Sequence, residues 1–232
     1  MLPESIKKFI EIFSVLPGIG VRQATRIAFK LINSGQNKIE ETAKAVNDLR
    51  HLKICSECFF VYSPISVNQR THQRKPAPVV ERSSLRGSPE PCSALVRGAS
   101  TLCDICSDPN RQQNIIAIVE KETDLISIER TKKFKGRYLV LGELTKTGVL
   151  ESVQKLRLNH LKNWIKKEFG QAEEIIIAIN PTTYGDLNAS IIAKELSGFA
   201  KKITRLGRGI PTGGEIEFAD EETLSSALEG RT

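Results

Sequence analysis

The sequence lacks the features that would place the protein in a membrane or export it. In its 232 residues no apolar run approaches the ~18 residues that a membrane-spanning helix needs. The N-terminal residues, Met1 to Ile6, contain neither a charged leader nor an apolar signal core. There is also no internal repeat. We therefore expect a soluble protein that stays in the cytoplasm.

Cysteine is scarce, and its arrangement argues against a disulfide framework. Of the five cysteines, four form two C-x-x-C pairs, Cys55 with Cys58 and Cys103 with Cys106, while Cys92 stands alone. An odd number of cysteines in such pairs is typical of a reducing compartment and of metal binding.

Neither the composition nor the net charge is extreme. Hydrophobic residues make up 40% and charged residues 26%, which is ordinary for globular proteins and excludes wholesale disorder. The formal charge of +7 is unevenly distributed: residues 1–54 carry +4, Glu57 gives −1, residues 59–102 carry +4, and residues 103–232 balance nineteen cations against nineteen anions. All the excess positive charge precedes the second cysteine pair.

Residues 59–102 form a stretch unlike the rest of the chain. They contain five of the ten prolines and many serines, and they show neither a helical nor an alternating apolar period. Such a stretch is typical of a long loop or a flexible insertion. Without it, 188 residues remain that alternate between helix and strand patterns.

The apolar periodicity predicts an α/β protein with a helical N-terminal part. The first part has helices over residues 4–15, 21–32 and 38–52, the first two separated by a tight hairpin at Pro17 to Gly20. Beyond Arg111, strands at 115–119, 137–141, 174–179 and 202–206 alternate with helices at about 122–130, 150–168 and 185–199. Short apolar strands separated by helices predict a mainly parallel sheet with helices on both faces. Asp220 can cap a last short helix over about 221–228.

The hairpin segment Leu16-Pro17-Gly18-Ile19-Gly20 has the residues of a phosphate-binding turn. Gly18 and Gly20 let backbone N–H groups approach a ligand, and the following helix begins with unsatisfied N–H groups. Arg22, Arg26 and Lys30 lie on one face of that helix. This pattern favours a helix-hairpin-helix that binds the DNA backbone without reading sequence. The alternative is an ordinary helical hairpin with solvated arginines.

The two cysteine pairs are knuckles of the kind that hold one tetrahedral zinc ion. The 44 residues between Cys58 and Cys103 exceed the ~15–20 of many zinc sites, but the extra loop length costs only about 1 kcal/mol. A redox pair or unrelated buried thiols are the alternatives. Cys92 could compete as a ligand, and we favour a free thiol because it has no partner at knuckle spacing.

Acidic residues follow two of the predicted strands. Glu120 closes the first strand, Asp124 follows it, and Asp186 lies beyond the Asn180-Pro181 turn after the third strand. Functional groups collect at the carboxyl ends of parallel strands, and carboxylates there could hold magnesium for phosphoryl chemistry. The alternative is that these acids cap helices and turns.

The order of these motifs resembles the RecR family of bacterial recombination mediators. The resemblance rests on Leu16 to Arg26, the four cysteines, Ile118-Val119-Glu120 with Ile126 to Thr131, Asn180-Pro181-Thr182, Thr204 to Gly214 and Phe218 to Leu224. It implies a helix-hairpin-helix domain (1–54), a four-cysteine zinc finger (55–110) containing the insertion 59–102, a Toprim domain (111–206) and a C-terminal Walker-B-like region (207–232).

The resemblance also implies function and site residues. Members of the family bind single-stranded, gapped or duplex DNA, form dimers and a ring-shaped tetramer, and work with RecO and RecF to load RecA at single-stranded gaps. The family's basic pair corresponds to Arg22 and Arg26, which join Gly18, Gly20 and Lys30 as the predicted DNA-binding residues. The implied zinc ligands are Cys55, Cys58, Cys103 and Cys106. Glu120, Asp124 and Asp186 correspond to an acidic Toprim surface that faces RecO.

Three departures from the family pattern bear on function. Tyr184 replaces a carboxylate in the Thr182 to Asp186 run, the segment Gly142 to Lys146 lacks the expected Gly-Gly-x-Leu-Ser-Pro, and the zinc loop is unusually long. A missing acid removes a magnesium ligand, which weakens the case for Toprim catalysis and favours a non-enzymatic DNA clamp. The resemblance implies that such a clamp is cytoplasmic and associates with the nucleoid during repair. The rival classes are a magnesium-dependent Toprim nuclease or primase, and a protein-only adaptor.

Overall fold

The computed structural model describes residues 2–64 and 101–231, which form two compact units, Met1–Leu52 and Lys53–Thr232. Cys92 and most of the predicted insertion, residues 65–100, lie outside the described residues. In the described ranges no helix is both long and apolar enough to cross a membrane.

Unit 1 is helical, as predicted, and has a very small core. It contains α1 (Glu4–Ser14), α2 (Val21–Asn33) and α3 (Gln36–Asp48), followed by the 3-10 turn η1 (Leu49–His51). Helices α1 and α2 pack together, yet the only residues buried between 2 and 52 are Ile6, Ala24 and Ala28. Large apolar side chains remain exposed on it, namely Leu2, Ile12, Val15, Leu16, Val21, Phe29, Ile32, Val46, Leu49 and Leu52.

Unit 2 is built on a four-stranded parallel sheet. Its strands are β3 (Gln112–Val119), β4 (Gly136–Val140), β5 (Ala172–Ala178) and β6 (Ala200–Arg205), in the order β4-β3-β5-β6. The first crossover, from β3 to β4, runs toward one edge, and the later crossovers run toward the other. Because parallel crossovers are right-handed, this reversal puts their helices on opposite faces.

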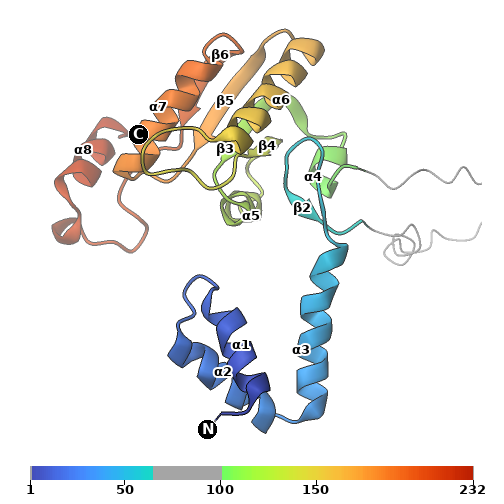
Figure 1. The fold of residues 1–232 in the computed structure, drawn as a ribbon. Helices are drawn as coiled ribbons and strands as arrows, with labels where there is room; N and C mark the ends of the chain where they lie inside the picture. Colours follow the sequence, from blue (N-terminus) through green and yellow to red (C-terminus); the bar gives the residue numbers. More distant parts are fainter. Residues whose placement is uncertain (1, 65–100, 232) are drawn as a thin grey trace, which may run out of the picture. The chain divides into compact units, whose positions relative to one another are not determined.

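The helices accordingly cover both faces of the sheet (Figure 1). On one face α6 (Ser152–Glu168) and α7 (Thr183–Leu196) pack against Ile116 and Ile118. On the other face α5 (Glu122–Arg130) packs Leu125 against Ala117 and Val119. The side chains of β3 alternate between two apolar cores, as expected for a strand buried on both sides. The predicted α/β fold is confirmed.

The C-terminal tail after β6 contains the 3-10 turn η3 (Ile216–Phe218) and α8 (Glu221–Glu229). The predicted cap is present: an Asp220 carboxylate oxygen accepts a 2.7 Å hydrogen bond from the Thr223 N–H. This bond also lowers the pKa of Asp220, because it stabilises the charged carboxylate.

A small finger begins unit 2, and it extends into the stretch assigned to the insertion. Strands β1 (Lys53–Ile54) and β2 (Val61–Tyr62) pair antiparallel, and α4 (Asp104–Ser107) carries the second knuckle. Residues 59–64 are therefore part of the finger, a correction to the predicted start of the insertion at 59. The sequence showed no strand there because a two-residue strand is too short to produce an alternating pattern.

Candidate functional site

The four paired cysteines meet at one point in the finger. Their sulfur atoms all lie within 4.8 Å of one another, and all four residues are buried. The Cys58 and Cys103 sulfurs are 3.5 Å apart, and the Cys103 N–H donates to the Cys55 sulfur at 3.4 Å. The pKa of the Cys55 thiol is lowered, chiefly by a hydrogen bond with the side chain of Cys103. Buried sulfurs at these distances form a group that can bind a metal ion.

The first knuckle also covers the edge of the sheet. The Val140 N–H of edge strand β4 donates to the Cys58 carbonyl at 2.9 Å. Beside it, Glu57 forms an ion pair with Arg137, whose guanidinium lies over the Trp164 ring at 4.6 Å. Burial lowers the pKa of Arg137. The finger is therefore joined to the sheet by backbone and side-chain contacts. Sequence reasoning missed Glu57 because no pattern links it to a residue 80 positions away.

The hairpin between α1 and α2 has the backbone conformation that its glycines suggested. Gly18 adopts a φ of 78°, which side-chain-bearing residues rarely adopt, and an added Cβ at Gly18 or Gly20 would meet no atom within 4 Å. Gly20 precedes α2 without any side-chain cap. The first N–H groups of α2 consequently remain available to a ligand.

Helix α2 presents a row of cations to solvent. Arg22, Arg26 and Lys30 are all exposed, at four-residue spacing. The buried Ala24 and Ala28 lie two residues further on, about 200° round the helix, so the basic row is opposite the packed face. The row begins at the uncapped N-terminus, where the helix dipole also attracts anions.

The three acidic residues in unit 2 do not form a common metal-binding group. Within the described residues, the cysteines are the one set of three or more ligands close enough to share an ion. Glu120 is largely buried, and its carboxylate accepts the Leu144 N–H at 3.3 Å. Asp124 accepts the Lys121 N–H at 3.1 Å and so caps α5.

Asp186 lies in a network of ion pairs near the start of α7. It forms ion pairs with Arg208 and with Arg205, the latter at 2.7 Å, and hydrogen bonds from these two arginines lower the pKa of its carboxyl group. Arg208 also contacts Glu222 of α8 at 2.8 Å. The network joins the start of α7 to the C-terminal tail, and sequence reasoning missed both arginines because the contacts span about twenty residues.

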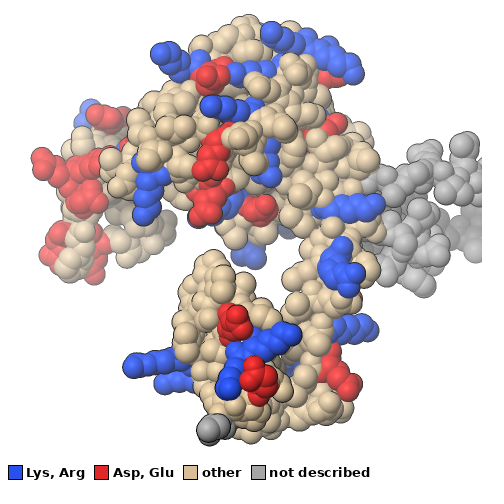
Figure 2. Space-filling view, viewed as in Figure 1, with Lys and Arg blue, Asp and Glu red and all other residues tan. Residues whose placement is uncertain are grey.

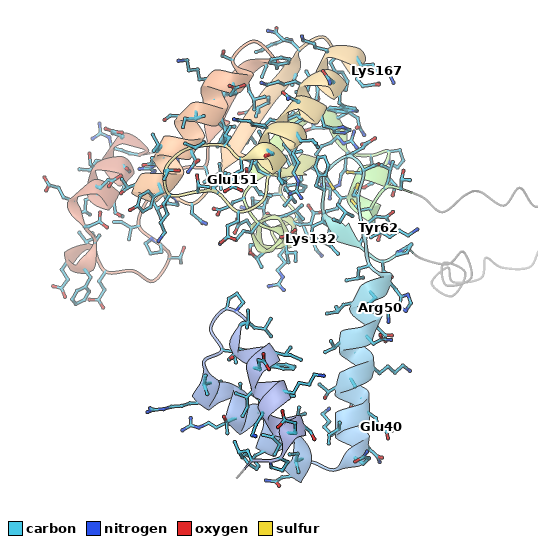
Figure 3. The ribbon with its side chains drawn as sticks, viewed as in Figure 1. Glu40, Arg50, Tyr62, Lys132, Glu151 and Lys167 are labelled. Carbon is cyan, nitrogen blue, oxygen red and sulfur yellow. The ribbon has the colours of Figure 1, made fainter. Side chains whose placement is uncertain are left out.

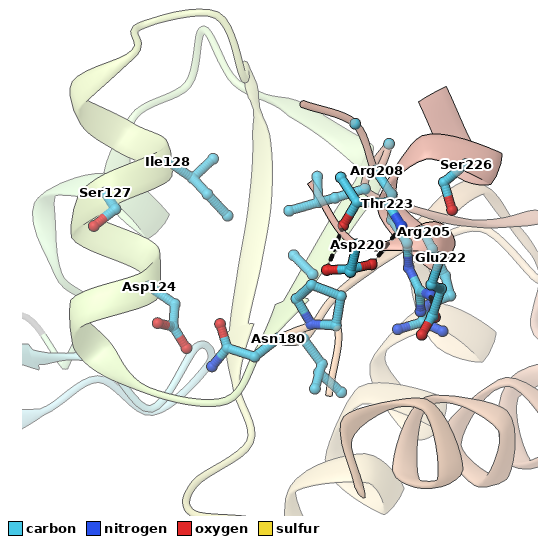
Figure 4. A pocket seen from close by; sticks show the side chains of 16 residues that line it. Asp124, Ser127, Ile128, Asn180, Arg205, Arg208, Asp220, Glu222, Thr223 and Ser226 are labelled. Carbon is cyan, nitrogen blue, oxygen red and sulfur yellow. Dashed lines mark hydrogen bonds and ion pairs between the residues drawn. The ribbon is translucent and has the colours of Figure 1, made fainter. Parts of the chain in front are cut away.

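A cavity of about 450 Å³ lies at the carboxyl ends of β5 and β6, between α5 and α8 (Figure 4). Asp124, Asn180, Arg205, Arg208 and Asp220 are among its lining residues. Of the three acids considered above, only Asp124 lines it. Acidic side chains also gather over the tail (Figure 2), including the exposed Glu215, Glu217, Glu221 and Glu229.

Comparison with protein-family models gives three matches along the chain. The RecR helix-hairpin-helix model matches residues 6–50, the Toprim domain model matches residues 114–207, and the RecR C-terminal model matches residues 209–232. The first match contains the hairpin with its basic row, and the second contains the parallel sheet.

Relatives that match nearly the whole chain were also found among curated proteins. A protein named recombination protein RecR from Clostridium perfringens is 34% identical over 99% of this chain and 97% of the relative. Proteins of the same name from Bifidobacterium animalis subsp. lactis and Gloeobacter violaceus are each 32% identical, over 98% and 100% of this chain and 95% and 98% of the relatives.

Proposed function

Because the chain belongs to the RecR family, whose members serve recombinational repair, we propose that it is a non-enzymatic mediator that binds DNA through the hairpin of unit 1. The observation that supports this most is the conjunction of an uncapped α2 N-terminus with the exposed row of Arg22, Arg26 and Lys30. Backbone N–H groups of Gly18 and Gly20 would donate hydrogen bonds to one phosphate of the DNA. The three cations would contact the phosphates that follow it along the strand. Such contacts position DNA without reading its sequence.

The exposed apolar surface of unit 1 supports self-association. Three buried side chains form a very small core for a unit of about fifty residues. Among its exposed apolar side chains, Val15 is 82% exposed. Burying such surface stabilises an assembly by roughly 25 cal/mol per Å². We propose that a second copy of the chain covers this face, within a dimer or a tetrameric ring that encircles DNA and brings several basic rows together.

The finger is proposed to hold zinc. A tetrahedral site with Zn–S bonds of about 2.3 Å places the sulfurs about 3.8 Å apart. That separation agrees with the 3.5 Å between the Cys58 and Cys103 sulfurs and with the 4.8 Å limit for the set. Zinc would supply structure there, since four protein ligands leave no open position for catalysis.

The remaining proposals concern partners. As in the family, the chain would act with RecO and RecF to promote RecA loading at single-stranded gaps, in the cytoplasm and at the nucleoid during repair. Glu120, Asp124 and Asp186 are proposed to belong to the surface that RecO contacts. Asp124 and Asp186 are only partly buried and carry charge near the carboxyl ends of the strands, where partner residues can approach.

The hairpin proposal is tested with the Arg22→Ala/Arg26→Ala double variant. We expect its affinity for single-stranded and gapped DNA to fall about tenfold or more, equally for all sequences. The slope of log affinity against log salt concentration should become shallower by about two. Fluorescence anisotropy over a range of salt concentrations measures both. Lys38→Ala/Lys44→Ala on α3 removes the same charge from the same unit and should leave binding nearly unchanged. Unaltered binding by the double variant would refute the hairpin as the DNA site.

The rival Toprim enzyme requires carboxylates that converge on magnesium. Glu120 and Asp124 each accept a backbone N–H, and Asp186 is paired with two arginines. We therefore expect no cleavage or primer synthesis when the protein is incubated with magnesium and single- or double-stranded DNA. Activity that disappears in Glu120→Gln would overturn the non-enzymatic proposal.

A further inference from the structure

A second concentration of positive charge lies on unit 2, at residues to which no function has yet been assigned. The segment 130–135, here called the basic loop, ends α5 and leads into β4. It carries four cations in six residues, and each of them is exposed: Arg130, Lys132, Lys133 and Lys135. Lys132 is labelled beside α5 in Figure 3, at the periphery of the unit.

Among the described residues, no carboxylate is paired with a cation of the basic loop. Glu129 is the one acidic residue between Leu125 and Tyr138, and both of its carboxylate oxygens are occupied. One oxygen is paired with Arg111, and the other accepts the Tyr138 hydroxyl at 2.9 Å. Throughout residues 2–64 and 101–231, no ion pair involves any of the four loop cations.

The loop backbone is held in a defined shape. The Thr131 hydroxyl donates to the Ile128 carbonyl at 2.7 Å and accepts the Lys133 N–H at 3.2 Å. The Lys135 carbonyl accepts the Gln112 N–H of β3 at 2.9 Å, and Phe134 packs edge-on against Tyr138. The cations therefore extend from an ordered backbone, and less entropy is lost when they bind a ligand.

The negative end of the α5 dipole does not account for four cations. A cation near a helix C-terminus contributes about 0.3–1 kcal/mol, and the effect falls off within the last turn. Arg130 already lies in that turn. Lys133 and Lys135 lie beyond it, where mutual repulsion between like charges opposes their clustering.

The charge of unit 2 shows the same surplus once the tail is counted separately. Residues 103–206 hold 17 cations and 13 anions, a net +4, whereas residues 207–232 hold two cations and six anions, a net −4. The net charges of these two segments cancel when they are added, so the total conceals a basic segment, 103–206, and an acidic tail, 207–232. The four cations of the basic loop are equal in number to the net charge of residues 103–206.

We propose that the basic loop binds the sugar–phosphate backbone of DNA, as a contact separate from the hairpin of unit 1. This inference rests on the proposed DNA-binding function and extends it to a second site. Lysine ammonium groups attract phosphates as point charges, and Phe134 is turned inward rather than offered for stacking on bases. The loop therefore contributes affinity and salt dependence without sequence preference.

The test compares Lys132→Gln/Lys133→Gln with Lys201→Gln/Lys202→Gln on β6. Both variants remove two exposed charges from unit 2, but Lys201 and Lys202 lie beside Glu173 and Glu174, at 2.8 and 3.9 Å. The loop variant should bind single-stranded and duplex DNA about tenfold more weakly and lower the salt slope by about two. The β6 variant should bind within about twofold of the wild type, and both should keep the wild-type melting temperature.

Two further arms separate this proposal from the hairpin proposal. In an Arg22→Ala/Arg26→Ala background, the loop substitutions should reduce the remaining affinity for DNA further. If only the hairpin variant loses affinity for DNA, the loop proposal fails and the hairpin proposal stands. If only the loop variant loses affinity, the reverse holds. A loop variant indistinguishable from the β6 variant on DNA would refute the second site. So would loss of binding to vesicles of anionic phospholipid with DNA binding unchanged.

Discussion

Cys55→Ser is expected to abolish metal binding and to destabilise all of unit 2. Structural zinc contributes ~10–16 kcal/mol to the folding of small fingers, and this contribution depends on the complete set of four thiolates that Cys55→Ser breaks. If the free energy of unfolding falls by about 3 kcal/mol or more, the melting temperature should fall by roughly 10 °C in a domain of this size. The Cys58 carbonyl accepts the Val140 N–H, so loosening the knuckle also uncovers edge strand β4.

Metal analysis and amide exchange test this expectation together. The wild type should contain about one zinc per chain, Cys55→Ser should contain none, and the Val140 amide should exchange faster in the variant. Cys92→Ser is the matched control and should keep both the metal and the melting temperature. Zinc retained in Cys55→Ser but lost in Cys92→Ser would reassign the fourth ligand.

The secondary structure of unit 2 could be predicted closely because its patterns are local. The helix predicted over 122–130 has those bounds, since the apolar period and the acidic first turn lie within it. Strand β3 begins three residues before the predicted 115, because Gln112, Gln113 and Asn114 are polar although they continue the strand. Helix α7 begins at Thr183 rather than 185, because Thr182 supplies the cap.

The contacts that join distant segments could not be predicted in the same way. Glu57 with Arg137, and Asp186 with Arg208, are separated by 80 and 22 positions, and each pair depends on how the strands are ordered in the sheet. The basic loop was missed for a different reason. Its charge was visible in the sequence, but counting residues 103–232 as one segment cancelled it against the acidic tail.

Gly185→Ala is expected to destabilise unit 2 strongly, although it adds a single methyl group. A Cβ at Gly185 would lie 2.0 Å from the Asn180 carbonyl oxygen, far inside van der Waals contact. That carbonyl cannot easily move, because it accepts the Thr182 N–H at 2.9 Å. The Gly185 N–H in turn donates to the Thr182 hydroxyl at 3.1 Å, so the methyl group would force apart the cap that begins α7. We expect the free energy of unfolding of unit 2 to fall by about 3 kcal/mol.

Gly198→Ala is the matched control, because a Cβ there would meet no atom within 4 Å. Thermal unfolding should show a melting temperature lower by about 6–12 °C for Gly185→Ala and nearly unchanged for Gly198→Ala. A shift in α7 would also displace Asp186, which follows Gly185 directly and is paired with Arg205 and Arg208. Proteolysis of the tail should therefore accelerate in Gly185→Ala under conditions where the sheet is still folded. Equal stability of the two variants would show that the turn at Asn180 yields to the methyl group, and the Asp186 network would then not depend on a rigid start of α7.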